Sequence, residues 1–220
     1  MAAKIWLLND PMDDHFASAA RVGTWKKISG KDIRVSPLVL EWQRGSEIVG
    51  DFLWPSFEGD IAVVERVFRE LQERFGGIEA RPVKVIRPKW RRRQRRSKNG
   101  SLTIWSQDFH FVDVRLLHQV DWDWDKSCIR TTEEEGQIIH EVLGGERLKV
   151  EVDPETFEVR SQRLLRVEGG GIFVKASLLE GHSFFKVSQS KWNLCTDAVR
   201  HFILEKGYTN VDFCEVGELF

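Results

Sequence analysis

The stretch from Phe52 to Ile86, FLWPSFEGDIAVVERVFRELQERFGGIEARPVKVI, predicts a strand, a helix and a second strand in succession. It begins with the apolar run Phe52–Trp54, which is followed by the turn-forming residues Pro55 and Gly59. Apolar residues then recur at the i, i+3, i+4, i+7 spacing of one helix face, at Val64, Val67, Phe68, Leu71 and Phe75. This spacing predicts a helix that buries one face in a core.

Local signals predict where this helix begins and ends. Asp60 is a suitable N-cap, because its carboxylate can accept hydrogen bonds from the first free amides. Glu65 and Arg69 form an i, i+4 pair in the favourable order along the helix. Gly76-Gly77 is expected to end the helix, and 78–86 continues as a strand rich in β-branched residues.

A similar pattern returns near the C-terminus. The strand-like run Phe184–Val187 precedes apolar residues at a comparable spacing, namely Cys195, Ala198, Val199 and Phe202. Gly207 then takes the place of Gly76, and an alternating strand follows over 211–216. Most other segments predict short strands, although 131–142 favours a short helix and 109–120 fits either a strand or a helix. We therefore expect an α+β fold, with a mixed or antiparallel sheet and two amphipathic helices in repeated strand-helix-strand modules.

Length and composition indicate a globular protein. The 220 residues, 41% hydrophobic and 30% charged, suit two α+β parts, 1–101 and 102–220, or one compact domain. No apolar run approaches the roughly 20 residues of a membrane span, and the N-terminus does not read as a secretory signal. Three widely spaced cysteines suit a reducing compartment, so the expected location is cytoplasmic.

The formal net charge of −1 conceals a basic segment on an acidic body. Residues 84–98 hold nine basic residues and no acidic one. Removing these nine from the 33 basic residues leaves 24 against 34 acidic residues, a formal charge of −10.

The basic segment has two interpretations. As a solvated hairpin loop it would be mobile because its like charges repel, and this is the favoured interpretation. As a nucleic-acid contact it would place arginines on phosphates and stack bases on a tryptophan. The candidate nucleic-acid-binding residues are Lys89, Trp90, Arg91, Arg92, Arg93, Arg95, Arg96 and Lys98.

Two acidic clusters are candidates for protein binding. The first alternates acids with tryptophans, and strand-like alternation would put both rings on one face and the three acids on the other. Exposed tryptophans among acids would make a good binding surface, whereas buried rings would belong to the core. The favoured interpretation places both rings in the core and the acids at the surface. The candidates are Asp121, Trp122, Asp123, Trp124 and Asp125, with Glu133, Glu134 and Glu135 forming the second cluster.

The sequence contains no recognisable catalytic or metal-binding motif. The six histidines form no HExxH pair and the cysteines form no CxxC pair. Gly169-Gly170-Gly171 lacks the lysine of a phosphate-binding loop, and no GxSxG elbow is present. We therefore expect no catalytic residues, no metal and no cofactor, and a binding protein rather than an enzyme.

Three segments together resemble a known family. They are the helix, glycines and strand of 63–83, the acidic middle segment 121–127, and the strand-helix-strand of 184–216. This pattern is similar to the eleventh-numbered immunity-protein family of bacterial polymorphic toxin systems, formerly a domain of unknown function. The arginine-rich segment and the many tryptophans depart from the family pattern, and no family site residues can be carried over.

The resemblance implies a cytoplasmic protein that binds and neutralises a cognate toxin domain. An acidic body would associate quickly with a basic toxin such as a nuclease, through complementary charge. The alternative is a nucleic-acid-binding accessory protein that acts through residues 89–98. Affinity that falls steeply with salt would distinguish it.

Overall fold

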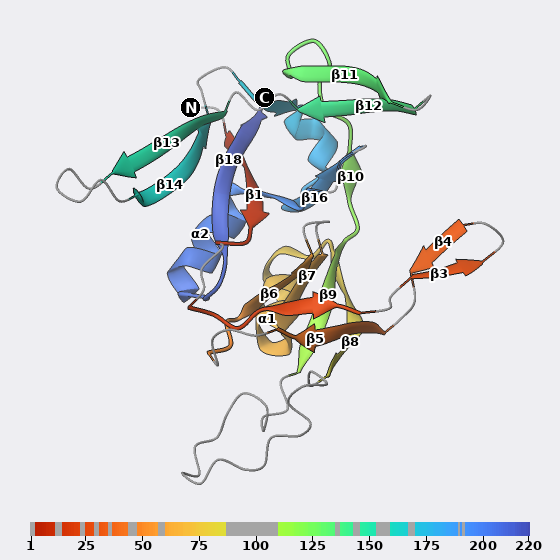
Figure 1. The fold of residues 1–220 in the computed structure, drawn as a ribbon. Helices are drawn as coiled ribbons and strands as arrows, with labels where there is room; N and C mark the ends of the chain where they lie inside the picture. Colours follow the sequence, from red (N-terminus) through yellow and green to blue (C-terminus); the bar gives the residue numbers. More distant parts are fainter. Residues whose placement is uncertain are drawn as a thin grey trace, which may run out of the picture. The chain divides into compact units, whose positions relative to one another are not determined.

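The computed structural model describes most of the chain outside the basic segment. The described residues are 3–11, 15–22, 25–28, 31–34, 37–43, 48–56, 60–86, 110–134, 137–142, 146–152, 159–166, 170–188, 190 and 192–220. Within them the fold is α+β, with two α-helices among many strands (Figure 1). The predicted fold class is confirmed.

The chain divides into two compact units that are not simple halves. The α1 unit comprises 10–117 and 206–212, and the α2 unit comprises 1–9, 118–205 and 213–220. The chain therefore passes from one unit to the other four times. The boundary predicted between residues 101 and 102 falls outside the described residues and stays a prediction.

The α1 unit is built on a six-stranded sheet with the order β2-β5-β8-β9-β7-β6. Its pairs are antiparallel except β5 and β8, which run parallel. The two outer strands, β2 and β6, also lie beside each other, so the sheet curls towards closure. The elements are β2 (Ala19–Arg21), β5 (Leu38–Trp42), β6 (Phe52–Ser56), β7 (Asp60–Val64), α1 (Glu65–Phe75), β8 (Ile78–Ile86) and β9 (Phe111–Leu116).

The curled sheet and helix α1 enclose the core of this unit. Leu40, Leu53, Ala62 and Phe111 belong to one buried cluster, and successive residues of β6 and β7 are buried on alternate faces. Helix α1 lies against β7, β8 and β9 and buries Val67, Phe68 and Leu71. The apolar spacing seen in the sequence is therefore the packed face of this helix.

The prediction for 52–86 is right in outline and wrong at the helix start. The helix begins at Glu65, with Val64 as an N-cap that makes no side-chain hydrogen bond, so Asp60 is not the cap. The reason is that 60–64 forms strand β7, paired with both β6 and β9, and its β-branched residues run directly into the helix. The end at Gly76 (φ 61°), the strand 78–86 and the 2.5 Å Glu65–Arg69 ion pair are confirmed.

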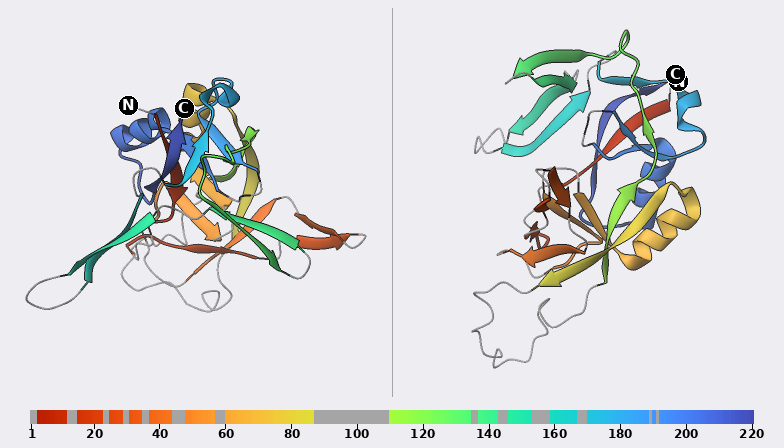
Figure 2. Two further views of the ribbon diagram at one scale, coloured as in Figure 1. Left: turned by 90° about the horizontal axis from the view of Figure 1, so that it is seen from above. Right: turned by 90° about the vertical axis from the view of Figure 1, so that its right-hand side faces the viewer.

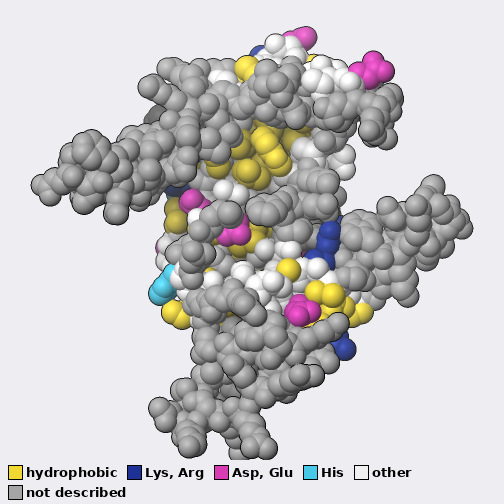
Figure 3. All heavy atoms as spheres, in the orientation of Figure 1, with side chains coloured by type: hydrophobic (Ala, Val, Ile, Leu, Met, Phe, Trp, Pro, Cys, Tyr) yellow, Lys and Arg dark blue, Asp and Glu magenta, His cyan; other side chains and the backbone are white. Residues whose placement is uncertain are grey.

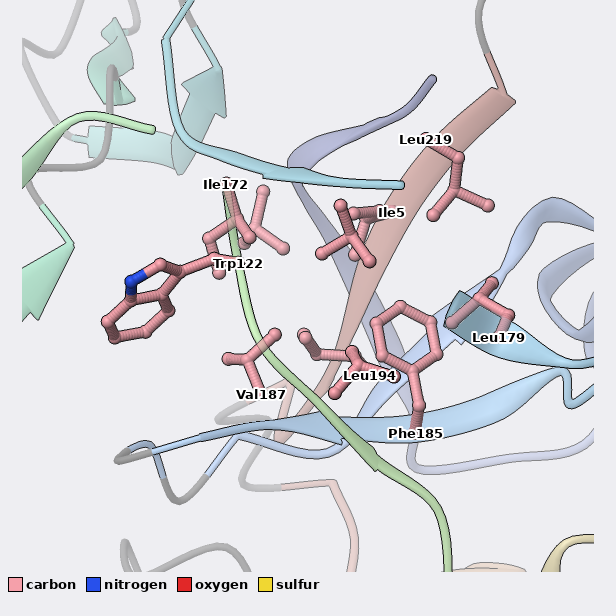
Figure 4. Packing of buried hydrophobic residues seen from close by; sticks show 11 residues of the cluster. Ile5, Trp122, Ile172, Leu179, Phe185, Val187, Leu194 and Leu219 are labelled. Carbon is pink, nitrogen blue, oxygen red and sulfur yellow. The ribbon is translucent and has the colours of Figure 1, made fainter. Parts of the chain in front are cut away.

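The α2 unit is built on a second six-stranded sheet, with the order β10-β16-β17-β1-β18-β15. Strands β1 and β18, from opposite ends of the sequence, lie side by side in it (Figures 1 and 2). Its elements are β1 (Ala3–Asn9), β10 (Gln119–Val120), β15 (Ile172–Val174), β16 (Phe184–Val187), β17 (Leu194–Thr196), α2 (Asp197–Lys206) and β18 (Asp212–Leu219). Ile5, Ile172, Phe185, Val187 and Leu194 are fully buried in its core (Figure 4).

Two-stranded hairpins account for the remaining strands. They are β3 (Trp25–Ile28) with β4 (Lys31–Arg34), β11 (Ile129–Glu134) with β12 (Gln137–Val142), and β13 (Glu146–Val152) with β14 (Val159–Arg166). The short helix predicted within 131–142 is wrong, because β11 and β12 pair through all six of their residues. The region 109–120, left open between strand and helix, forms β9 and β10 where it is described.

The details of the repeated module are not confirmed. Cys195, placed on a helix face by its spacing, lies in β17, and the helix begins only at Asp197. In each unit two strands precede the helix rather than one. The strands on either side of each helix are also not neighbours, since β9 separates β7 from β8 and β1 separates β17 from β18.

Candidate functional site

The first acidic cluster lies on a segment that is held against strand β15. After β10, the Asp123 amide donates a 2.7 Å hydrogen bond to the Phe173 carbonyl, and the Cys128 amide donates one of 3.2 Å to the Gly171 carbonyl. The Ser127 hydroxyl accepts a 2.9 Å bond from the Phe173 amide and is buried. These bonds occupy the edge of β15 that does not face β18, so the backbone of this segment is fixed.

The carboxylate of Asp123 shapes the turn. Its Oδ1 accepts hydrogen bonds from the amides of Asp125, at 3.1 Å, and Lys126, at 3.0 Å. Residues 124–126 therefore form a turn, and the strand-like alternation expected for 121–125 is wrong. Asp121 and Asp125 remain exposed. Of the three aspartates, Asp123 has a structural role and the other two face solvent.

The turn also separates the two tryptophans. Trp122 is 4% exposed and lies at the border of the apolar cluster, with its ring nitrogen directed away from the labelled aliphatic side chains (Figure 4). Trp124 is 51% exposed and makes an edge contact with Trp122, with ring centroids 5.3 Å apart. Trp122 is thus a core residue, and Trp124 is the ring of this pair that can meet a partner.

Residues that the sequence did not connect with this segment lie next to it. The Lys126 ammonium sits 3.3 Å from the centroid of the Phe220 ring, which is 42% exposed. The backbone of Phe220 bonds to Val174 and Ala176 at the end of β15. Nothing in the local sequence relates residue 220 to residue 126, because the contact arises from the parallel pairing of β15 and β18.

The other candidate residues are placed less completely. Glu133 lies in β11 with an exposed side chain, and Glu134 ends the same strand. Glu135 and the whole basic segment 89–98 lie outside the described residues, so both remain predictions. On the face shown in Figure 3, the described acidic and basic side chains are interspersed rather than gathered into separate areas. Among the described residues, the local cluster with exposed Asp121 and Asp125 is the feature to test.

The described residues show no arrangement suited to a metal. No three histidine, cysteine or acidic side chains among them come together around one point. His118 and His182 are close, but their rings stack with centroids 4.4 Å apart, and His118 Nε2 bonds to the Leu178 carbonyl at 2.8 Å. Stacked imidazoles do not direct their nitrogens at a shared ion.

The three cysteines differ in exposure. All are free thiols, with Cys128 exposed, Cys214 partly buried and Cys195 completely buried. Burial raises the pKa of the Cys195 thiol far above its ordinary value, with a smaller contribution from Asp197. Cys195 is therefore a packing residue of β17, because the reactive thiolate form is disfavoured there.

A second polar cluster, in the α1 unit, involves the segment 206–212. Asp51 accepts hydrogen bonds from Thr209 through the backbone amide, at 2.9 Å, and the hydroxyl, at 3.1 Å, and it pairs with Arg66. The Asn210 side chain donates to the Phe52 carbonyl at 2.8 Å. These contacts attach the connection between α2 and β18 to the end of β6.

Two ionisable groups at this segment are perturbed. The 2.6 Å hydrogen bond from Lys206, with a smaller contribution from Tyr208, lowers the pKa of Glu70. Burial, followed by the proximity of Glu70, raises the pKa of the Tyr208 phenol. Both shifts favour the native contact, since it joins an ionised carboxylate to a neutral phenol. The cluster has the character of a structural attachment.

Comparison with known proteins adds no family. No protein-family model matches the chain, and no curated protein matches its sequence. Within the described residues, no helix is long and apolar enough to cross a membrane. Any functional conclusion therefore has to come from the residues themselves and from the resemblance in the sequence.

Proposed function

We propose that this protein is an immunity protein that binds and neutralises a cognate bacterial toxin domain by protein–protein contact, without catalysis. The proposal includes a cytoplasmic location. The single observation that supports it best is Trp124, a half-exposed indole on a segment fixed by backbone hydrogen bonds and flanked by exposed Asp121 and Asp125. The family resemblance supplies the kind of partner.

A binding residue on an ordered segment loses little conformational freedom when a partner binds. Tryptophan is among the residues that contribute most to protein interfaces, because its ring buries a large area with few rotatable bonds. Trp124 lies in a turn that hydrogen bonds to Asp123 already order, so binding would cause little further loss of backbone conformational entropy. Asp121 and Asp125 would attract a basic partner and speed its approach.

The test begins with identification of the partner. Protein captured from a nuclease-treated lysate of the native cell should contain one stoichiometric partner, whose toxin domain can then be purified and titrated. Trp124→Ala should weaken that affinity by roughly 30-fold, or about 2 kcal/mol, as expected for an interface anchor. Asp121→Lys with Asp125→Lys should slow association more than it speeds dissociation.

A matched charge control separates local recognition from net charge. Glu73→Lys with Glu205→Lys changes the total charge equally, at exposed positions on α1 and α2. Unchanged affinity in this control, with loss in the aspartate variant, would support the proposed surface. Equal effects in both variants, or an unaffected Trp124→Ala variant, would refute it. Loss of the captured partner on nuclease treatment would favour the nucleic-acid alternative. In that case, deletion of 89–98 should abolish nucleic-acid binding.

A further inference from the structure

The two sheets share one order of strands. In the α1 unit, five neighbouring strands follow the order β6-β7-β9-β8-β5, and in the α2 unit they follow the order β16-β17-β1-β18-β15. The first and second strands pair antiparallel in both units, as do the second and third. The fourth and fifth strands pair parallel in both. The units therefore correspond strand by strand.

The correspondence extends along the chain. In each unit the helix follows the second strand directly and ends at a glycine with positive φ, 61° at Gly76 and 66° at Gly207. In each unit a further segment contacts both the first and the fifth of these five strands. In the α1 unit, β2 lies beside β6 and β5. In the α2 unit, 119–128 bonds to β16 at one end and to β15 at the other. The hairpins are inserted after this segment in both cases.

Strand β1 is the exception to this order. The middle strand of the α1 unit is β9, which among the described strands follows β8 along the chain. The middle strand of the α2 unit is β1, which comes from the opposite end of the chain. In Figure 1, β1 starts at the end of the sheet where β18 finishes, which is where a strand following β18 would begin. Its position is therefore that of a displaced final strand.

We propose that β1 is a donor strand: it fills a slot between β17 and β18, and a second copy of the chain can supply it in place of the protein's own. The partner is thus an identical chain that exchanges residues 3–9. This inference concerns assembly and is independent of the proposed neutralising role.

The contacts of β1 explain why exchange would preserve the fold. Ile5 and Leu8 are buried, and the Leu8 amide donates to the Asn193 carbonyl at 3.0 Å. Asp197 accepts from the Trp6 ring nitrogen at 2.7 Å and from the Lys4 amide at 3.0 Å.

At the other side of β1, Lys4 Nζ lies 2.6 Å from Glu215. The partners in all these bonds come from residues 193–215, so the slot is made by the C-terminal part of the chain. Each of these contacts can form with β1 of the same chain or with β1 of a second chain. The two arrangements differ in the effective concentration of β1 at the slot.

The native Cys195 provides the test, because it lies opposite Trp6 in the register of β1 and β17. One full-length chain carries Trp6→Cys with Cys195→Ser, and a second keeps Trp6 and Cys195. Both carry Cys128→Ser and Cys214→Ala to remove other thiols. A chain with Trp6→Cys and native Cys195 is the control. An intrachain disulfide in this control shows that cysteines at positions 6 and 195 join when β1 is inserted beside β17.

The two full-length chains are unfolded together, refolded at high concentration and oxidised. We expect a covalent dimer joined through Cys195, with a yield that rises with refolding concentration. An intrachain disulfide in the control, without dimer in the mixture at any concentration, would overturn exchange. A circular permutant provides a second measurement: it starts at Asp10 and carries residues 1–9 after Phe220 through a short linker. It should fold as a monomer with the parent circular dichroism, and failure to fold would contradict the assignment of β1.

Discussion

The two neighbouring tryptophans give the sharpest test of the local structure. Trp122→Ala and Trp124→Ala remove the same side chain two residues apart on one segment. Trp122 is 4% exposed and Trp124 is 51% exposed. If the turn made by Asp123 separates a core residue from a surface residue, the two substitutions must differ greatly in their effect on the free energy of unfolding.

The structure sets the expected size of each effect. Truncating a buried aromatic side chain to alanine costs about 3–5 kcal/mol, and Trp122 should fall in this range. Its buried ring nitrogen has no hydrogen-bond partner among the described residues, so Trp122→Phe should recover much of the loss. Trp124→Ala removes a half-exposed ring together with its edge contact with Trp122, a contact worth about 0.5–1.5 kcal/mol.

Urea denaturation followed by far-ultraviolet circular dichroism measures both values, since the midpoint is determined within each variant and most of this signal comes from the backbone amides. The slope of the unfolding free energy against urea concentration should stay close to the parent value. A change in the urea midpoint then reports a change in stability. A loss below about 1 kcal/mol for Trp122→Ala would refute its place in the core. Equal losses for the two variants would refute the separation of the rings.

Three further predictions concern ionisable groups. Cys128 should react quickly with a thiol reagent in the native protein, while Cys195 should react only on unfolding; rapid modification of all three thiols in the native protein would contradict the burial of Cys195. The pKa of Glu70 is lowered below its ordinary 4.5, so its contact stabilises the fold above that pH and is lost as the pH falls through and below it. Glu70→Gln should therefore be less stable than the parent near neutral pH, and the difference should shrink in acid; a difference that grew in acid would contradict the sign. Tyr208 is the one tyrosine in the sequence and its pKa is raised, so phenolate absorbance should stay absent above pH 10 until the protein unfolds, and the fold should lose stability as the pH rises past 10.

Local patterns in the sequence predicted the parts of the fold that depend on local interactions. The apolar spacing of helix α1, its end at Gly76 and the strand 78–86 all follow from residues close together in the chain. The predicted start of the helix was wrong because a tertiary interaction overrides the local signal. Residues 60–64 can form either helix or strand, and pairing with β9, some 50 residues later, decides for the strand.

Long-range pairing also explains what the sequence could not predict about architecture. The apolar residues Ile138, Ile139 and Val142 suggested a short helix within 131–142, whereas the complete pairing of β11 with β12 makes this region a hairpin. The insertion of β1 between β17 and β18 joins residues almost 200 positions apart. No local periodicity carries that information, because it depends on which open strand edges meet in the folded chain.

The role of 121–125 as a binding site stays a prediction, and the local geometry expected for it was wrong. Its acids and aromatic residues are visible in the sequence, but strand-like alternation assigned both tryptophans to the same face. The hydrogen bonds from Asp123 to the amides of Asp125 and Lys126 change that geometry. A short polar side chain that competes for backbone amides is a known turn former, and this was the signal that could have been used.

The most direct test of the proposed function is the affinity of the purified toxin domain for Trp124→Ala, measured by calorimetry beside the parent protein and the Glu73→Lys, Glu205→Lys control. The account predicts a loss of roughly 30-fold for Trp124→Ala, with an unfolding free energy within about 1.5 kcal/mol of the parent and an unaffected control. Parent-like affinity in the folded Trp124→Ala variant would contradict the claim that this surface binds the toxin.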